Sequence, residues 1–280
     1  MESWIQGEAG AVSRTPGPPP TRRSLCVDFR ALGLSNGSTV LVHSSLSALG
    51  WVVGGAQTLV LALEDAIGAT GTLMMPAYSL NAPEPSVWKN PPVPELWWET
   101  IRTEWPPFDR ELSPGVHLGA VAEAFRHQRG TERSDHPNNS FCARGPVART
   151  LLESHSLNDS MGEGSPLARL YERHGQVLLL GVDHSSNSSL HLAEYRSQWP
   201  GKRSSIPFKA RMMREGTTVE VEFRDLDLNS DDFGRLGEDF ERETGSFRAG
   251  PVGAGVGRLM DQRALVDFAV SWIEKHRSWA

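Results

Sequence analysis

The stretch "STVLVHSSLSALGWVVGGAQTLVLALEDAIGATGTLMMP", residues 38–76, decides the fold class. It opens with a short apolar run typical of a buried strand, and a loop of small residues then leads into an amphipathic segment that ends at Gly68. A second apolar run, residues 71–76, closes the stretch. A strand, a helix and a strand in this order predict two parallel strands joined by a right-handed crossover, and hence an α/β fold.

The rest of the chain adds helices and a hairpin to this core. Apolar residues at helical spacing predict helices within residues 25–34, 115–126, 165–175, 188–196, 231–245 and 261–276, and an apolar run predicts a buried strand at 176–182. Two alternating runs around Glu215-Gly216 predict a β-hairpin. We therefore expect a mostly parallel central sheet flanked by helices, with an added antiparallel hairpin. Residues 77–116 are rich in Pro and Trp, and because tryptophans argue against disorder we expect a folded loop over a cleft.

Composition limits the classes of function. The chain has 280 residues and 39% hydrophobic content, enough for a good core, and no apolar run approaches the ~18 residues of a membrane span. The net charge of -6 argues against nucleic acid as a partner. Residues 1–23 contain Pro and Gly but no signal-peptide pattern, so they are predicted to be a disordered leader before a single domain over residues 24–280. Cys26 and Cys142 are predicted to be buried thiols in a reducing cytoplasm.

The loop after the first strand is one candidate binding site. Ligands of an open parallel sheet lie beyond the carboxyl ends of its strands, and the start of a helix offers free N–H groups to an anion. Ser44, Ser45, Gly54 and Gly55 occupy this position, and such small residues let a long, narrow ligand approach the backbone. A phosphorylated, amide-rich cofactor such as coenzyme A fits, and a tight structural turn is the alternative. No G-x-S-x-G motif supports a nucleophilic serine.

The stretch "GVDHSSNSSLHLAEYR", residues 181–196, is a candidate catalytic segment. His191 and Glu194 lie three residues apart on the predicted helix and therefore share one face. A carboxylate next to an imidazole fixes its tautomer and raises its basicity, which gives a general base for an amine or a hydroxyl. A surface ion pair is the alternative. His136 in "SDHPNNSF" is a second candidate, whose role could be only to shape the site.

The third candidate is the acidic stretch of residues 223–245. Its carboxylates are Asp225, Asp227, Asp231, Asp232, Glu238, Asp239, Glu241 and Glu243. If the stretch borders the cleft, it attracts a polycation, and otherwise it is a solvated helix face.

Other familiar motifs are missing from the sequence. It contains no G-x-x-x-x-G-K-[ST], no H-E-x-x-H and no cysteine cluster, so no metal site is predicted. The Gly-rich residues 253–258 do not lie between a strand and a helix of an early βαβ unit, so we do not expect a dinucleotide-binding loop there.

Several segments together resemble the aminoglycoside 3-N-acetyltransferases. They are "LVHSSLSALGWVVGGAQTLVLAL…GTLMMPAYS", "GAVAEAFR…RSDHPNNSFCARG", "GSPLARLYERHGQVLLLGV" and "LHLAEYR", and the likeness covers roughly residues 24–276. The resemblance implies an enzyme that transfers acetyl from acetyl-coenzyme A to the 3-amino group of a 2-deoxystreptamine ring, and so inactivates an aminoglycoside antibiotic.

The resemblance also implies roles for individual residues. Ser44, Ser45 and the Gly54-Gly55 turn would lie along the pantetheine arm of coenzyme A, with Ser113, Gly115 and Val116 near the cofactor. His191 and Glu194 would be catalytic, with His136 and Glu123 as supporting candidates. The antibiotic would contact Tyr78, Asn81, Asp183, Asp227, Asp232 and Glu238.

Two other functions stay open at this stage. An acetyltransferase of another small amine would keep the cofactor and base residues. A noncatalytic binding protein of the same fold would not need the intact His191 and Glu194. We expect a monomer or homodimer without nucleic-acid or membrane partners.

Overall fold

The computed structural model describes residues 2–79, 85–87, 91–202 and 205–278, without the side chains of residues 2–7 and 87. The described residues form one seven-stranded sheet in the order β3-β4-β2-β1-β5-β9-β8. Its strands are β1 (Thr39–Ser44), β2 (Thr72–Pro76), β3 (Glu132–Arg133), β4 (Phe141–Arg144), β5 (Gln176–Leu180), β8 (Phe247–Val252) and β9 (Gly255–Asp261). The three central strands, β2, β1 and β5, run parallel, and the outer pairs are antiparallel.

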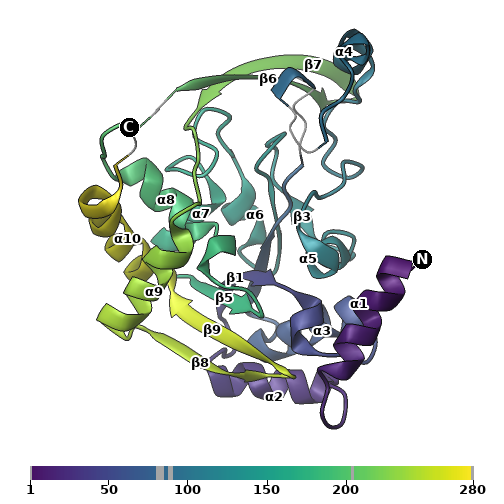
Figure 1. Ribbon diagram of the computed structural model, residues 1–280, viewed down its shortest axis with the longest axis vertical. Helices are drawn as coiled ribbons and strands as arrows, with labels where there is room; N and C mark the ends of the chain where they lie inside the picture. Colours follow the sequence, from purple (N-terminus) through teal and green to yellow (C-terminus); the bar gives the residue numbers. More distant parts are fainter. Residues whose placement is uncertain (1, 80–84, 88–90, 203–204, 279–280) are drawn as a thin grey trace.

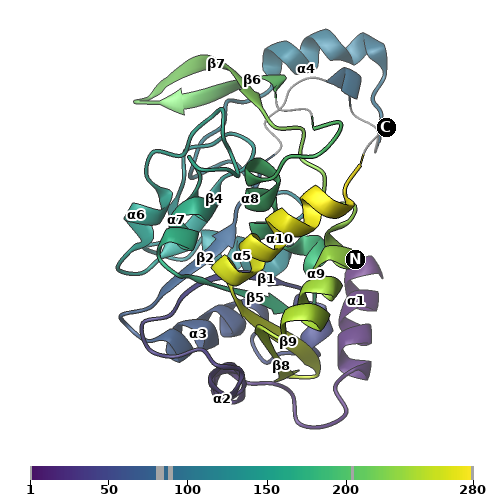
Figure 2. The same ribbon diagram turned by 90° about the vertical axis from the view of Figure 1, so that its left-hand side faces the viewer.

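Helices cover both faces of this sheet (Figures 1 and 2). Along β1 the side chains alternate, so that Val40 and Val42 face one core and Leu41 faces the other. The first core packs against α2 (Arg22–Leu32), α3 (Gly55–Ile67) and α5 (Gly119–Arg126). The second packs against α6 (Ala148–Leu152), α7 (Pro166–Glu172), α8 (Ser189–Arg196), α9 (Phe233–Thr244) and α10 (Gln262–His276).

A separate antiparallel hairpin of β6 (Ile206–Arg214) and β7 (Thr217–Asp225) arches over the top of the molecule in Figure 1. Its two turn residues, Glu215 and Gly216, both have positive φ, as a tight two-residue hairpin requires. The Pro- and Trp-rich segment includes α4 (Trp98–Glu104) and is tied to the hairpin at Phe108. The Phe108 N–H donates to the carbonyl oxygen of Arg211, and the Met213 N–H donates back to that of Phe108.

The structure confirms the α/β class, the added hairpin and the six predicted helical segments. It adds β3, β4, β8 and β9, which the sequence analysis left without strands. The first two are too short to show alternation, and the last two contain Gly and Pro, which strands disfavour.

The first residues also differ from prediction. Residues Glu2–Ser13 form the helix α1 inside the segment predicted to be a disordered leader. It packs against the short helix η1 (Leu46–Leu49), and Arg14 donates two hydrogen bonds to the carbonyl oxygen of Ser47. In the described parts of the chain, no helix has the length and apolar character needed to cross a bilayer.

Candidate active site

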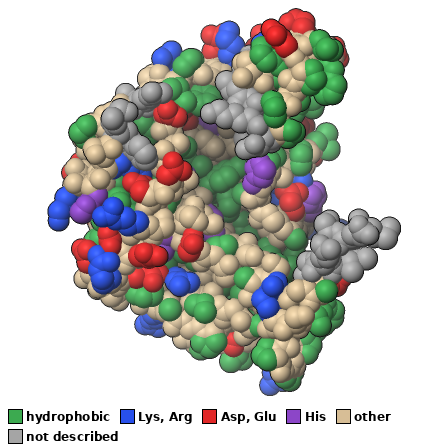
Figure 3. Space-filling view, viewed as in Figure 1, with side chains coloured by type: hydrophobic (Ala, Val, Ile, Leu, Met, Phe, Trp, Pro, Cys, Tyr) green, Lys and Arg blue, Asp and Glu red, His purple; other side chains and the backbone are tan. Residues whose placement is uncertain are grey.

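A cavity of about 1090 Å³ opens where the carboxyl ends of the three parallel strands meet. Figure 3 shows it as a hollow in the middle of the face seen in Figure 1, with acidic side chains to its left. His43 and Ser44 end β1, Met75 and Pro76 end β2, and Val182 follows β5, and all five line the cavity. The edge of the sheet predicted to hold the ligand therefore holds a large cavity.

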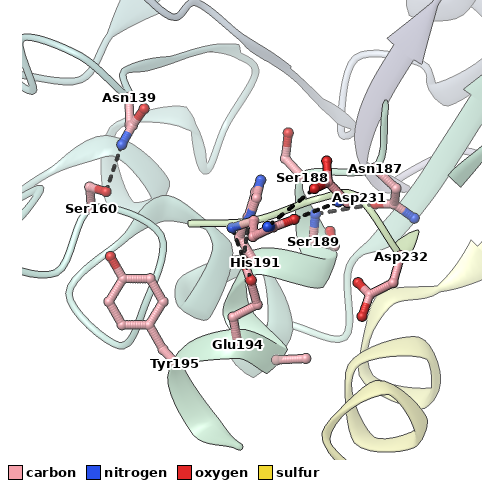
Figure 4. Close-up of polar contacts among 12 residues, drawn as sticks. Asn139, Ser160, Asn187, Ser188, Ser189, His191, Glu194, Tyr195, Asp231 and Asp232 are labelled. Carbon is pink, nitrogen blue, oxygen red and sulfur yellow. Dashed lines mark hydrogen bonds and ion pairs between the residues drawn. The ribbon is translucent and has the colours of Figure 1, made fainter. Parts of the chain in front are cut away.

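His191 and Glu194 form a hydrogen-bonded pair in the wall of this cavity. Glu194 is fully buried, whereas His191 lines the hollow. His191 Nδ1 donates to Glu194 Oε2 at 2.5 Å, and a dashed line joins the two side chains in Figure 4. Because the carboxylate holds the proton on Nδ1, the neutral ring presents an unprotonated Nε2, and among the described residues nothing is bonded to it. The pair has the arrangement of a general base.

His43 is a second histidine at the cavity, and it is held neutral. Burial, and then the proximity of His191, lower the pKa of His43 to about 3. Its Nε2 accepts a hydrogen bond from the Ser188 N–H at 3.4 Å. The Ser188 hydroxyl in turn shares a hydrogen bond with the hydroxyl of Tyr78, whose pKa is raised by burial. These groups fix the start of α8, which carries His191.

Two helix N-termini face the same cavity. Gly54 and Gly55 begin α3, and Leu118 and Gly119 begin α5. Neither helix has a side-chain cap, so first-turn N–H groups are left for a ligand or water, except that of Gly55, which donates to the carbonyl oxygen of Val52. Among the described lining residues there is no Lys or Arg, and Glu8 of α1 is the one carboxylate. An anionic group bound here would therefore be held by main-chain N–H groups.

A sequence profile described as aminoglycoside 3-N-acetyltransferase matches residues 41–274. The chain belongs to this family. The aminoglycoside N(3)-acetyltransferase VIII of Streptomyces fradiae is 40% identical, over 94% of this chain and 95% of its own length. The YokD protein of Bacillus subtilis, named an aminoglycoside N(3')-acetyltransferase-like protein, is 41% identical over 91% and 92% of the two chains.

Solved structures agree with these sequence matches. The crystal structure of YokD has a TM-score of 0.90 at 40% identity, covering 95% of this chain and 97% of its own. The structure of AAC-IIIb in a binary complex with CoASH has a TM-score of 0.82 at 33% identity, covering 93% and 98%.

The cofactor residues expected for this acetyltransferase family lie partly in the cavity. Ser44, Ser45, Gly54, Gly55 and Val116 line it. Ser113 and Gly115 are not in its lining: the Ser113 hydroxyl accepts a hydrogen bond from the Asp109 N–H, and the Gly115 N–H donates to Glu123. The segment of residues 117–120, which the sequence analysis did not select, lines the cavity in their place.

The carboxylates expected to bind an aminoglycoside do not line the cavity of this acetyltransferase. Asp232 forms an ion pair with Arg277, and Asp183 caps η4 (His184–Ser186) by accepting from Ser185. Asp227, in the loop between β7 and α9, and Glu238, on α9, are exposed. Tyr78 does line the cavity, and Asn81 lies outside the described residues.

The two supporting candidates have structural partners away from the cavity. His136 is buried and accepts hydrogen bonds at Nδ1 from the N–H groups of Asn138 and Asn139, and burial lowers its pKa to about 4. It therefore stays neutral in a polar turn. For Glu123, burial opposes ionisation, but hydrogen bonds from Arg126 and the Gly115 N–H outweigh it, and the pKa is lowered.

Other cavity residues escaped the sequence analysis. Glu8 and Ala11 of α1 form part of the wall, where Glu8 accepts a hydrogen bond from the indole N–H of Trp51. Phe233 at the start of α9 packs on the His191 ring, with centroids 4.8 Å apart. His43, at the end of the apolar strand β1, also lines the cavity, and this position is the sequence signal that could have pointed to it.

Proposed function

We propose that this protein transfers the acetyl group of acetyl-coenzyme A to the 3-amino group of a 2-deoxystreptamine aminoglycoside. One observation carries the proposal: the His191–Glu194 pair lies in the wall of a cavity that also receives two uncapped helix N-termini. The base can serve an amine, and the N–H groups suit a phosphorylated cofactor. The complex of AAC-IIIb with CoASH supports the choice of coenzyme A.

In the proposed reaction, His191 Nε2 takes the proton that the amine loses. Glu194 keeps the proton on Nδ1 and stabilises the imidazolium that forms. The amine nitrogen attacks the thioester carbonyl, a C–N bond forms, and the C–S bond of the tetrahedral intermediate breaks. The sulfur leaves as the thiol of coenzyme A once it gains a proton, which His191 can return.

The oxyanion needs donors close to the loop after β1. The N–H of Ser45 is not one of them, because it donates to the carbonyl oxygen of Leu180 at 2.9 Å. The hydroxyl groups of Ser44 and Ser45 line the cavity on this loop and are candidates for this role.

A second candidate is acetylation of a different small amine. It is favoured by one observation, that Asp183, Asp227, Asp232 and Glu238 are outside the cavity lining. A cytoplasmic location fits both reactions, because Cys26 and Cys142 are free thiols.

A thiol-release assay tests the proposal. The protein is mixed with acetyl-coenzyme A and either an aminoglycoside with a 2-deoxystreptamine ring, an aminoglycoside whose ring carries no 3-amino group, or a simple primary amine. We expect release with the first, and mass spectrometry should show one added acetyl at the 3-nitrogen. Release only with the simple amine would favour the second candidate, and no release with any amine would reject both.

A further inference from the structure

Arg277, just after α10, is a buried arginine next to the candidate base. Its residue exposure is 4%, and its guanidinium lies over the ring of Trp199 at 5.0 Å. Nη1 donates to Glu194 Oε1 at 2.5 Å, and Nε donates to Asp232 Oδ2 at 2.8 Å, with a second bond from Nη2 to the same carboxylate. The residue lies beyond the span 41–274 matched by the family profile.

The two oxygens of Glu194 have different partners. Oε1 accepts from Arg277 and, at 3.1 Å, from the N–H of Asn229, whereas Oε2 accepts only from His191 among the described residues. The two donors on Oε1 fix the rotation of the carboxylate. Arg277 thereby holds Oε2, which has no other partner among the described residues, toward His191 Nδ1.

We propose that Arg277 is a positioning residue for the His191–Glu194 base, and that Asp232 tunes it electrostatically as the counter-ion of Arg277. This inference rests on the proposed function and adds a specific role for residues outside the cavity lining. Glu194, Arg277 and Asp232 together carry one net negative charge next to His191. Removing the charge of Arg277 leaves a net charge of −2 on this cluster, and removing the charge of Asp232 leaves a net charge of zero.

The other titratable groups around the base change this balance little. His43 of β1 is neutral, because its pKa is about 3. Tyr78 after β2 is neutral, because burial raises its pKa. Lys202, after α8, donates to the carbonyl oxygens of Tyr195 and Ser197 and is a further cation on which Glu194 acts. It is the same in every variant below, so it does not change the direction of the expected shifts.

Two substitutions should shift the pH profile in opposite directions. In Arg277→Met, the additional negative charge stabilises the imidazolium form of His191, so the acidic limb of kcat/KM should move up by about one pH unit. In Asp232→Asn, Arg277 is opposed only by Glu194, so the limb should move down by roughly half a unit. Arg277→Lys keeps the charge but loses the fork of donors, so kcat should fall about tenfold with the limb little moved.

A purely structural clamp predicts a different result. It predicts lower activity and stability in these variants with an unmoved limb, and that outcome would overturn the inference. Arg235→Met is the matched control, since Arg235 is an exposed arginine of α9 over the Trp272 ring at 5.7 Å, and its profile should not change. If Arg277→Met fails to fold, Asp232→Asn still decides, because a limb that does not move down refutes the charge coupling.

A second readout separates this inference from the proposed function. The protonation of the His191 ring can be followed by NMR in histidine-labelled protein, with its signal assigned by its loss in His191→Asn. The opposite shifts in Arg277→Met and Asp232→Asn should appear there even if no aminoglycoside is acetylated. If the His191 pKa shifts but no aminoglycoside is acetylated, the proposed substrate is rejected and the charge coupling is kept. If aminoglycosides are acetylated but the His191 pKa does not shift, the charge coupling is rejected and the proposed function is kept.

Discussion

Replacing Glu194 with Gln should abolish most of the activity, although the two side chains have nearly the same shape. Oε1 of Glu194 receives two N–H donors, from Arg277 and Asn229. The oxygen of the amide must therefore stay at that position, which places its NH₂ group against His191 Nδ1. An NH₂ group donates, so Nδ1 must accept, and the ring proton moves to Nε2. In this tautomer Nε2 cannot take a proton from the amine.

The magnitude follows from the cost of turning the amide around. With the NH₂ group at the Oε1 position, two buried donors would lose their acceptor, at about 1–3 kcal/mol each. A total of about 2 kcal/mol or more leaves the active tautomer populated roughly 30-fold less or worse, since 1.4 kcal/mol is a factor of ten. The loss of the carboxylate charge adds to this. We expect kcat to fall by roughly 10²–10⁴, as for His191→Ala, with the affinity for acetyl-coenzyme A little changed.

The assay is steady-state thiol release at pH 7–8, with circular dichroism to show that each variant is folded. Glu163→Gln is the control, since Glu163 pairs with Arg196 of the same helix but is largely exposed. Glu194→Ala imposes no tautomer, so any folded fraction should retain more activity than Glu194→Gln. A Glu194→Gln enzyme within tenfold of the wild type, or more active than Glu194→Ala, would refute this reasoning.

Three further predictions concern the cofactor loop, the antibiotic and the acid stability. Gly54→Ala should raise the KM for acetyl-coenzyme A several-fold, because a Cβ there meets Thr58 Oγ1 at 2.5 Å and φ is +76°. The control is Gly216→Ala, with φ +78° and open space, which should lose a similar ~1 kcal/mol of stability and leave that KM unchanged. Equal KM values in the two variants would remove the loop from the cofactor site. The KM for an aminoglycoside should rise with added salt more steeply than that for acetyl-coenzyme A, because a polycation approaches a protein of net charge -6; parallel salt dependences would contradict this. Burial lowers the pKa of His43 and His155 to about 3 and of His136 to about 4, so below pH 6.5 the unfolded chain binds more protons than the folded protein. As the pH is lowered from 6.5 to 5, the free energy of unfolding should therefore fall by up to about 1.4 kcal/mol per pH unit for each histidine. Urea titrations that show a constant free energy of unfolding over that range would count against the burial of these histidines in the neutral form.

The sequence was sufficient for the parts of the site that are local in the chain. The His191–Glu194 pair depends on a spacing of three residues in a helix, and the structure has the bond that this spacing predicts. The loop after β1 could be placed because parallel strands end at one edge of a sheet. The antiparallel strands β8 and β9 could not be placed. They lie in a Gly-rich stretch, β9 pairs with β5 about 80 residues away, and β8 pairs only with β9 among the described strands.

The acidic segment shows why long-range partners decide a carboxylate's role. Its composition left two alternatives open, a surface for polycations and a solvated helix face. In the structure Asp239 accepts a hydrogen bond from the Trp272 indole, Glu241 pairs with Arg258, and Asp232 pairs with Arg277. None of these partners lies close in sequence, so no periodicity could show them. Arg277 lies 83 residues from Glu194 and belongs to no motif, so its contact with the base could come only from the folded chain.

The uncapped starts of α3 and α5 matter for inhibitor design. A drug whose anionic group binds main-chain N–H donors is difficult to evade by mutation, because no side-chain replacement except proline removes a peptide N–H. The positions that could reshape these donors are Gly54, Gly55 and Gly119, and all three have φ between +60° and +78°. A side chain at any of them strains the backbone and lowers the stability of the folded enzyme. Escape from such a drug by these substitutions would therefore leave a less stable enzyme.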